Sequence, residues 1–153
     1  FWEMGIDLGK YKDHIGNALQ LNTNFHFGTF KSYRSSLLYF MFSGSLNQIE
    51  GRNEVLTQFI NFGGSNSIRG YAENQFKAEW MSLQSVELIF GDFSRSQFFV
   101  FLDSALAKDI KINPSSGFGI RVFDGKFFYD VSLGFPFGEL REAKLNIKFN
   151  TRL

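Results

Sequence analysis

Hydrophobic and polar residues alternate along most of this chain. In residues 2–9, Trp2, Met4, Ile6 and Leu8 occupy the even positions, and every odd position is charged or glycine. Such alternation is typical of a β-strand with one apolar and one polar face. Similar patterns occur in residues 16–30, 35–46, 79–91, 97–107, 116–123, 127–135 and 144–153. The pattern therefore predicts an all-β, antiparallel fold of eight strands.

The predicted connections between these strands alternate in length. Short connections lie near residues 31–34, 91–96 and 124–126, where Asp124-Gly125 is a hairpin signal. Longer ones lie near residues 49–78, 108–114 and 137–143, while the connection near 12–15 is short and departs from the alternation. Short turns at one rim and long loops at the other are typical of outer-membrane β-barrels.

The composition favours lipid as the environment of the apolar strand faces. Aromatic residues make up 18% of the chain, with 21 Phe, and they stand beside many Asn, Ser, Gly and Lys. A barrel that faces lipid outside and water inside needs both kinds of residue, and strands of roughly 9–11 residues cross a bilayer. We therefore predict a transmembrane β-barrel over residues 1–153, with a soluble barrel or sandwich as the alternative.

Other function classes receive no support from the sequence. The formal net charge of +1 does not favour nucleic-acid binding, and the chain has no Cys for disulfides or Cys-based metal sites. Phosphate-loop, dinucleotide-binding and nucleophile-elbow motifs are missing, and neither His14 nor His26 has a partner at metal-ligand spacing. The acidic residues Asp7, Glu87, Asp103 and Asp130 lie on polar strand faces, where wall charges are commoner than acid–base pairs. We predict no enzymatic activity, metal or cofactor.

The longest connection, about residues 49–78, is the strongest candidate for a functional segment, because loops of this length are usually functional or disordered. Its first part allows a short helical turn near Glu54–Phe59. Further on, Gly63, Gly64 and Gly70 permit tight turns that fold the loop back and deliver Arg69 into the barrel. An arginine fork there suits the carboxylates of the next two strands. An ordinary solvated loop arginine is the alternative.

The loop sequence GGSNSIRGY, residues 63–71, resembles the GG-x-x-S-[VI]-R-G-[FY] signature of the BamA/TamA-type outer-membrane assembly and translocation barrels. The SVE of residues 85–87 resembles the S-L-E of the next strand in that family, and the FLD of residues 101–103 resembles its F-x-D. Residues 116–121 and 129–136 resemble the family's last hairpin, G-x-G-[IL]-R with a Y/F-P ending. The order of these motifs is more specific than any one of them.

This resemblance implies a loop latch. The corresponding motif residues are Gly63, Gly64, Ser67, Ile68, Arg69, Gly70 and Tyr71. In the family, the loop arginine meets acidic residues on the barrel wall, which implies Asp103, Glu87 and Phe101 as lumenal partners here. The family's first and last strands meet in a weak seam that opens sideways for client proteins. That implies a seam strand at 144–153, with Leu145, Ile147 and Phe149.

Three departures from the family accompany the resemblance. Ala105 stands where a glycine is usual, and the chain ends in Leu153, where such barrels commonly end in Phe or Trp. Family barrels also have sixteen strands, and a closed eight-stranded barrel is filled by its own side chains. The eight strands are therefore expected to be the C-terminal half of a larger barrel, completed by an N-terminal half or by a second copy.

The resemblance implies a bacterial outer-membrane protein that inserts or translocates β-rich client proteins. Its expected partners are outer-membrane lipid, barrel or secreted clients, and periplasmic modules or the second barrel half. Two alternatives remain open. The barrel could anchor or export an enzyme encoded upstream, such as a patatin-type phospholipase, or it could be a passive barrel or ligand binder.

Overall fold

The computed structural model describes residues 2–13, 16–50, 59–92, 95–125 and 127–151. Eight long strands form one antiparallel sheet in the order β1-β2-β3-β6-β7-β8-β9-β10. Their bounds are β1 (Trp2–Asp13), β2 (Gly16–Tyr33), β3 (Ser36–Glu50), β6 (Trp80–Asp92), β7 (Ser96–Ala107), β8 (Ser115–Asp124), β9 (Phe127–Pro136) and β10 (Lys144–Thr151). Each strand pairs with its neighbours in the chain, apart from the crossing from β3 to β6. The all-β, antiparallel, eight-stranded prediction is confirmed.

Several strands extend beyond the ranges predicted from alternation. The pairing of β2 with β3 continues to Tyr33↔Ser36, and the pairing of β1 with β2 continues to Asp13↔Gly16. Ladder hydrogen bonds depend on the backbone, so they continue past the point where side-chain alternation fades. The short strands β4 (Ile60–Phe62) and β5 (Phe76–Ala78) and the 3₁₀ turn η1 (Leu140–Glu142) were not predicted.

The connections follow the predicted arrangement. The chain reverses within a few residues after β2, β6 and β8, all at one rim of the sheet. More residues separate β3 from β6, β7 from β8 and β9 from β10, and β3, β7 and β9 end at the other rim. At that rim β1 and β2 are the exception, since only two residues separate them in the sequence. The helical turn predicted near Glu54–Phe59 lies, apart from Phe59, outside the residues that the structure describes. His14 and the side chain of Asp7 lie outside them as well.

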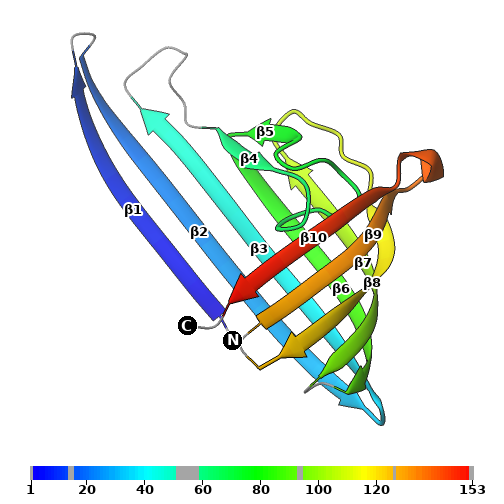
Figure 1. Ribbon diagram of the computed structural model, residues 1–153. Coiled ribbons are helices and arrows are strands. Elements are labelled where there is room, and N and C mark those ends of the chain that lie inside the picture. Colours follow the sequence, from blue (N-terminus) through cyan, green and yellow to red (C-terminus); the bar gives the residue numbers. More distant parts are fainter. Residues whose placement is uncertain (1, 14–15, 51–58, 93–94, 126, 152–153) are drawn as a thin grey trace.

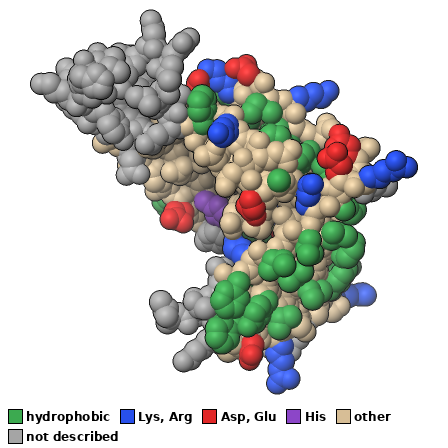
Figure 2. Space-filling view, turned by 45° about the horizontal axis from the view of Figure 1, so that its top comes forward, with side chains coloured by type: hydrophobic (Ala, Val, Ile, Leu, Met, Phe, Trp, Pro, Cys, Tyr) green, Lys and Arg blue, Asp and Glu red, His purple; other side chains and the backbone are tan. Residues whose placement is uncertain are grey.

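The two faces of the sheet differ sharply in polarity. In β7, Phe98, Val100 and Leu102 are exposed on what we call the outer face, whereas Phe101 and Asp103 are buried on the inner face. Exposed outer-face side chains on the other strands include Trp2, Met4, Ile6, Leu8, Phe25, Phe27, Leu38, Phe40, Phe90, Phe118, Ile120, Val122, Phe127, Tyr129, Leu145, Ile147 and Phe149. Figure 2 shows hydrophobic side chains gathered in a broad patch on one part of the surface. Contiguous apolar surface of this kind marks a contact with lipid or protein.

The sheet is strongly curved and open. In Figure 1, the loop that carries β4 and β5 lies within the curve of the sheet. The edge strands are β1 and β10, and they are not paired with each other in the described structure. No helix within the described ranges is long and apolar enough to span a membrane.

Candidate functional site: a loop bound to the inner face

The folded-back loop, residues 60–78, is held in shape by its own hydrogen bonds. Its ends pair as the two short strands β4 and β5, with Phe62 opposite Phe76. At the tip, the amide of Gly63 donates to the Ser67 hydroxyl at 2.6 Å. Gly63 and Gly64 have φ angles of 120° and 85°, which side chains other than glycine rarely adopt. The sequence signal of clustered glycines therefore corresponds to a defined turn.

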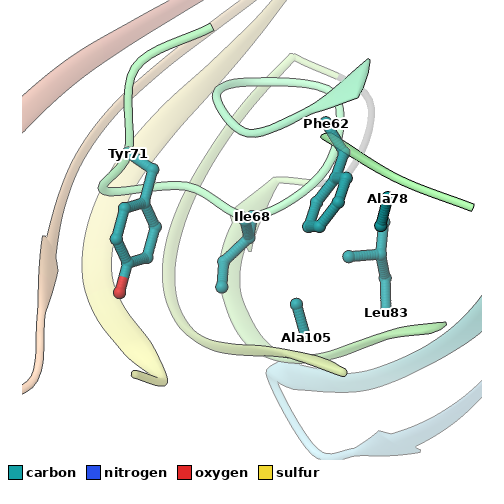
Figure 3. Close-up of a cluster of buried hydrophobic side chains, with 6 residues drawn as sticks. All are labelled: Phe62, Ile68, Tyr71, Ala78, Leu83 and Ala105. Carbon is teal, nitrogen blue, oxygen red and sulfur yellow. The ribbon is translucent and has the colours of Figure 1, made fainter. Parts of the chain in front are cut away.

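A cluster of hydrophobic side chains fastens this loop to β6 and β7. The cluster, shown in Figure 3, consists of Phe62, Ile68, Tyr71, Ala78, Leu83 and Ala105. Ile68 is fully buried, and the Tyr71 hydroxyl donates to the Asn113 carbonyl oxygen at 2.8 Å. Ala105, which stands where the family usually has glycine, is itself buried within this cluster. Its methyl group thus adds to the packing of the loop.

Arg69 is the centre of the contact between loop and sheet. Its Nε and Nη2 donate to the two carboxylate oxygens of Asp103 at 2.8 and 2.7 Å, and its backbone amide donates to Asp103 at 3.1 Å. Its Nη1 donates to Glu87 at 2.6 Å, and Nη2 also donates to the Ser85 hydroxyl at 3.0 Å. The guanidinium is buried, so its charge is screened far less than at an open surface.

Burial would by itself lower the pKa of the Arg69 guanidinium. The hydrogen bond and the charge of Asp103, together with Glu87, outweigh burial and raise the pKa above its ordinary value. Arginine stays charged in proteins, and the attachment of Arg69 depends on the carboxylates that face it.

Two phenylalanine rings, which we call the aromatic floor, pack against the guanidinium groups of the site. The Arg69 guanidinium carbon lies 3.7 Å from the ring centroid of Phe101, a cation–π contact. Phe101 and Phe99 stand opposite Gly117 and Gly119 of β8, respectively. A Cβ at Gly119 would come within 2.5 Å of the Phe99 ring, so the glycines leave the space that the rings fill.

A second arginine extends the network across the sheet. Arg121 of β8 donates from Nη1 and Nη2 to the two oxygens of Glu87 at 2.7 and 2.9 Å. Its Nε donates to Asp130 of β9 at 2.7 Å, and its guanidinium carbon lies 4.0 Å from the Phe99 ring centroid. Glu87 is thus shared by two guanidiniums, one from the loop and one from the wall.

The predicted site residues fall into two groups. The loop motif and its predicted partners Glu87, Asp103 and Phe101 are brought together in this network. Leu145, Ile147 and Phe149 lie elsewhere, exposed on the outer face of edge strand β10. Whether either group acts as a latch or a seam remains a prediction.

The structure adds Ser85, Phe99, Arg121 and Asp130 to the site. The sequence carried a usable signal for them, because alternation puts all four on the polar or inward face. What the sequence did not give is the register of the strands. The pairings Ser85↔Asp103, Phe99↔Gly119 and Arg121↔Asp130 bring these positions together.

A cavity of about 370 Å³ opens beside this network. Its lining combines charged, polar and aromatic side chains, including Tyr39, Ser67, Gln97, Asp130 and Lys148. The described residues contain no cluster of His, Asp or Glu side chains suited to hold a metal ion.

No protein-family model matches the chain, and a search of curated proteins finds no significant match.

Proposed function

We propose that this chain forms the C-terminal half of a sixteen-stranded β-barrel of the bacterial outer membrane, of the BamA/TamA type. One observation carries the proposal. The loop motif that resembles the family's signature delivers Arg69 to Asp103 and Glu87 on the inner face, while the outer face is lined with exposed hydrophobic side chains. Apolar residues outside and polar residues inside are the pattern of transmembrane barrels.

The position of the loop supports a barrel wider than eight strands. Closing eight strands on themselves gives an interior just wide enough for their own side chains. Here the inner face instead packs against the loop, with Ile68 and Phe62 buried between them. Further strands paired with β1 and β10 would close the barrel and leave room for the loop.

The proposed activity is the insertion or translocation of β-rich client proteins. The edge of β10 offers backbone donors and acceptors on which an incoming strand can pair. The Arg69 contacts hold the loop against the wall during this process, so we call them the latch. No cofactor enters this scheme.

The test is client insertion by the full-length protein in liposomes. Arg69→Ala removes every side-chain contact of the latch, and we expect insertion to slow while the barrel stays folded by circular dichroism. Lys108→Ala is the matched control, because it breaks an exposed ion pair with Glu79 at the rim. Equal insertion by Arg69→Ala and the unsubstituted protein, both folded, would rule out the latch. If the unsubstituted protein itself inserts no client, the insertion proposal fails, and an anchor for an upstream enzyme or a passive barrel is left.

A further inference from the structure

Glu87 has two competing cationic partners, which bears on how the loop can leave. Its Oε1 accepts from both Arg69 and Arg121, and its Oε2 accepts from Arg121. Asp103, in contrast, is bound by Arg69 and by the hydroxyl of Ser85. The two carboxylates that hold the loop therefore differ in what remains when Arg69 departs.

The role of Arg121 is clearest in the released state, in which the loop has left the inner face. If the loop moves away, Glu87 keeps both hydrogen bonds from Arg121 and stays a paired carboxylate. Without Arg121, release of the loop would leave Glu87 as a carboxylate on the inner face with no cation bound. An unpaired buried charge is costly, so Arg121 lowers the cost of release.

The docked state points in the same direction. Arg69 and Arg121 both donate to Glu87 Oε1, so two positive charges lie close together when the loop is bound. Their repulsion opposes docking. Arg121 also fixes the Glu87 side chain, which favours docking, but the side-chain entropy of one glutamate is small beside the loss of a counter-ion.

We propose that Arg121 is a substitute partner for Glu87 that makes the latch reversible. It holds the carboxylate when Arg69 leaves, and it shares the Glu87 Oε1 atom with Arg69 when the loop is docked. This inference rests on the latch proposed above. A residue that only supported Glu87, which we call a brace, would strengthen loop docking, whereas a substitute partner weakens it.

Amide hydrogen exchange of the loop, residues 60–78, measures the released population directly, because the Arg69 amide is bonded to Asp103 only when the loop is docked. The experiment uses the full-length protein in lipid, with mass spectrometry as readout. For Arg121→Gln we expect exchange of the loop to slow about tenfold, which corresponds to about 1.4 kcal/mol. For Arg69→Ala we expect faster exchange.

Lys148→Gln controls for the loss of one positive charge inside the curve of the sheet. Lys148 lines the same cavity and is the strand partner of Asp130, but it is not a partner of Glu87 in the described network. We expect this variant to leave loop exchange nearly unchanged. In a Glu87→Gln background, Arg121→Gln should slow loop exchange less, because the carboxylate that it serves is gone and only its repulsion of Arg69 is removed.

The outcomes separate this inference from the latch itself. If Arg69→Ala does not speed exchange, the latch fails. Suppose instead that Arg69→Ala speeds loop exchange, while loop exchange in Arg121→Gln is equal to or faster than in the unsubstituted protein and strand exchange is unchanged. Arg121 then only strengthens loop docking, and this inference is overturned. Should Arg121→Gln fail to fold, Arg121→Lys replaces it. Because lysine lacks the two-pronged contact with Glu87, it should also slow exchange, and equal or faster exchange would count against the proposal.

Discussion

Gly70 of the loop lies backbone to backbone against Gly134 of β9. A Cβ at position 134 would stand 2.7 Å from the Gly70 nitrogen, and one at position 70 would stand 2.9 Å from the Phe135 nitrogen. Gly70 also has a φ of 90°, a conformation that favours glycine. Since Gly134 pairs with Lys144 at the start of β10, the loop rests on the strand that borders the sheet edge.

Gly134→Ala should displace the loop without touching a charged group. The added methyl group meets backbone atoms of Arg69 and Gly70, which cannot rotate away as a flexible side chain could. Overpacking of this kind costs about 1–3 kcal/mol. We expect faster amide exchange over residues 60–78 and retained β-sheet circular dichroism.

Gly5→Ala is the matched control for that substitution. Gly5 also lies in a strand, but a Cβ there would meet no atom within 4 Å. Its loop exchange should equal that of the unsubstituted protein. If Gly134→Ala behaves like Gly5→Ala, the glycine contact is not what seats the loop.

Arg69→Lys tests the geometry of the latch while keeping its charge. Lysine carries a single ammonium group and cannot reproduce the two parallel hydrogen bonds to Asp103 together with the contact to Glu87. Hydrogen bonds to charged groups contribute about 1.5–3 kcal/mol, so we expect loop docking to weaken by at least that order. The measurement is loop exchange in lipid.

Lys108→Gln serves as the comparison for Arg69→Lys. It breaks an ion pair whose two side chains are 45% and 41% exposed, and solvent screens such pairs strongly. Its loop exchange should change little. If Lys108→Gln changed loop exchange more than Arg69→Lys, the loop would be attached mainly at the rim and not at the inner face.

The strands and the loop contact were accessible from the sequence for a simple physical reason. Period-two alternation reports which face of a strand is apolar, and each of the eight segments chosen on this pattern is a strand. The glycines around Arg69 predicted a loop that turns back, and the carboxylates on the polar faces of the next two strands predicted the partners of Arg69. The contacts of Arg69 with Asp103 and Glu87 follow from that arrangement.

The second arginine was not accessible in the same way. Alternation puts Arg121 on the polar face but says nothing of which residue stands beside it, because a strand's register is fixed by pairing along its whole length. Arg121 reaches Glu87 across β7, over Phe99, two strands away. Such a contact depends on sheet curvature and on the small size of Gly119, both of which are three-dimensional properties.

Phe101→Leu probes the aromatic floor beneath Arg69. Leucine keeps an apolar side chain but removes the ring that faces the guanidinium at 3.7 Å and covers Gly117. A desolvated cation–π contact is worth about 2 kcal/mol, and the lost ring adds a packing defect. We expect a lower urea midpoint and faster loop exchange.

Phe98→Leu is the control for the aromatic floor. Phe98 is a neighbour on the same strand, but its ring lies on the outer face and is 44% exposed. Loop exchange should be unaffected in this variant. If both substitutions speed loop exchange equally, the general loss of a ring in β7 is responsible and the contact with Arg69 is not.

Ile120→Lys tests whether the outer face meets lipid. Ile120 lies in the middle of β8 and is 52% exposed on that face. In a soluble protein, a lysine at an exposed position would be tolerated. In a transmembrane barrel, a lysine facing the bilayer midplane costs about 2–4 kcal/mol. We expect folding of the full-length protein into liposomes to become less favourable by that order, measured by urea titration.

Asn24→Lys is the counterpart of Ile120→Lys on the inner face. Asn24 belongs to β2, is exposed, and stands between Gly5 of β1 and Ser45 of β3 on the polar side of the sheet. Because water fills the interior of a wide barrel, a lysine there keeps its hydration and should cost little in liposomes. The difference between the two variants isolates the environment of each face from the general effect of adding a charge. If the protein folds in water without lipid or detergent, and both variants are tolerated alike, the outer face contacts water or another protein, and the transmembrane proposal fails.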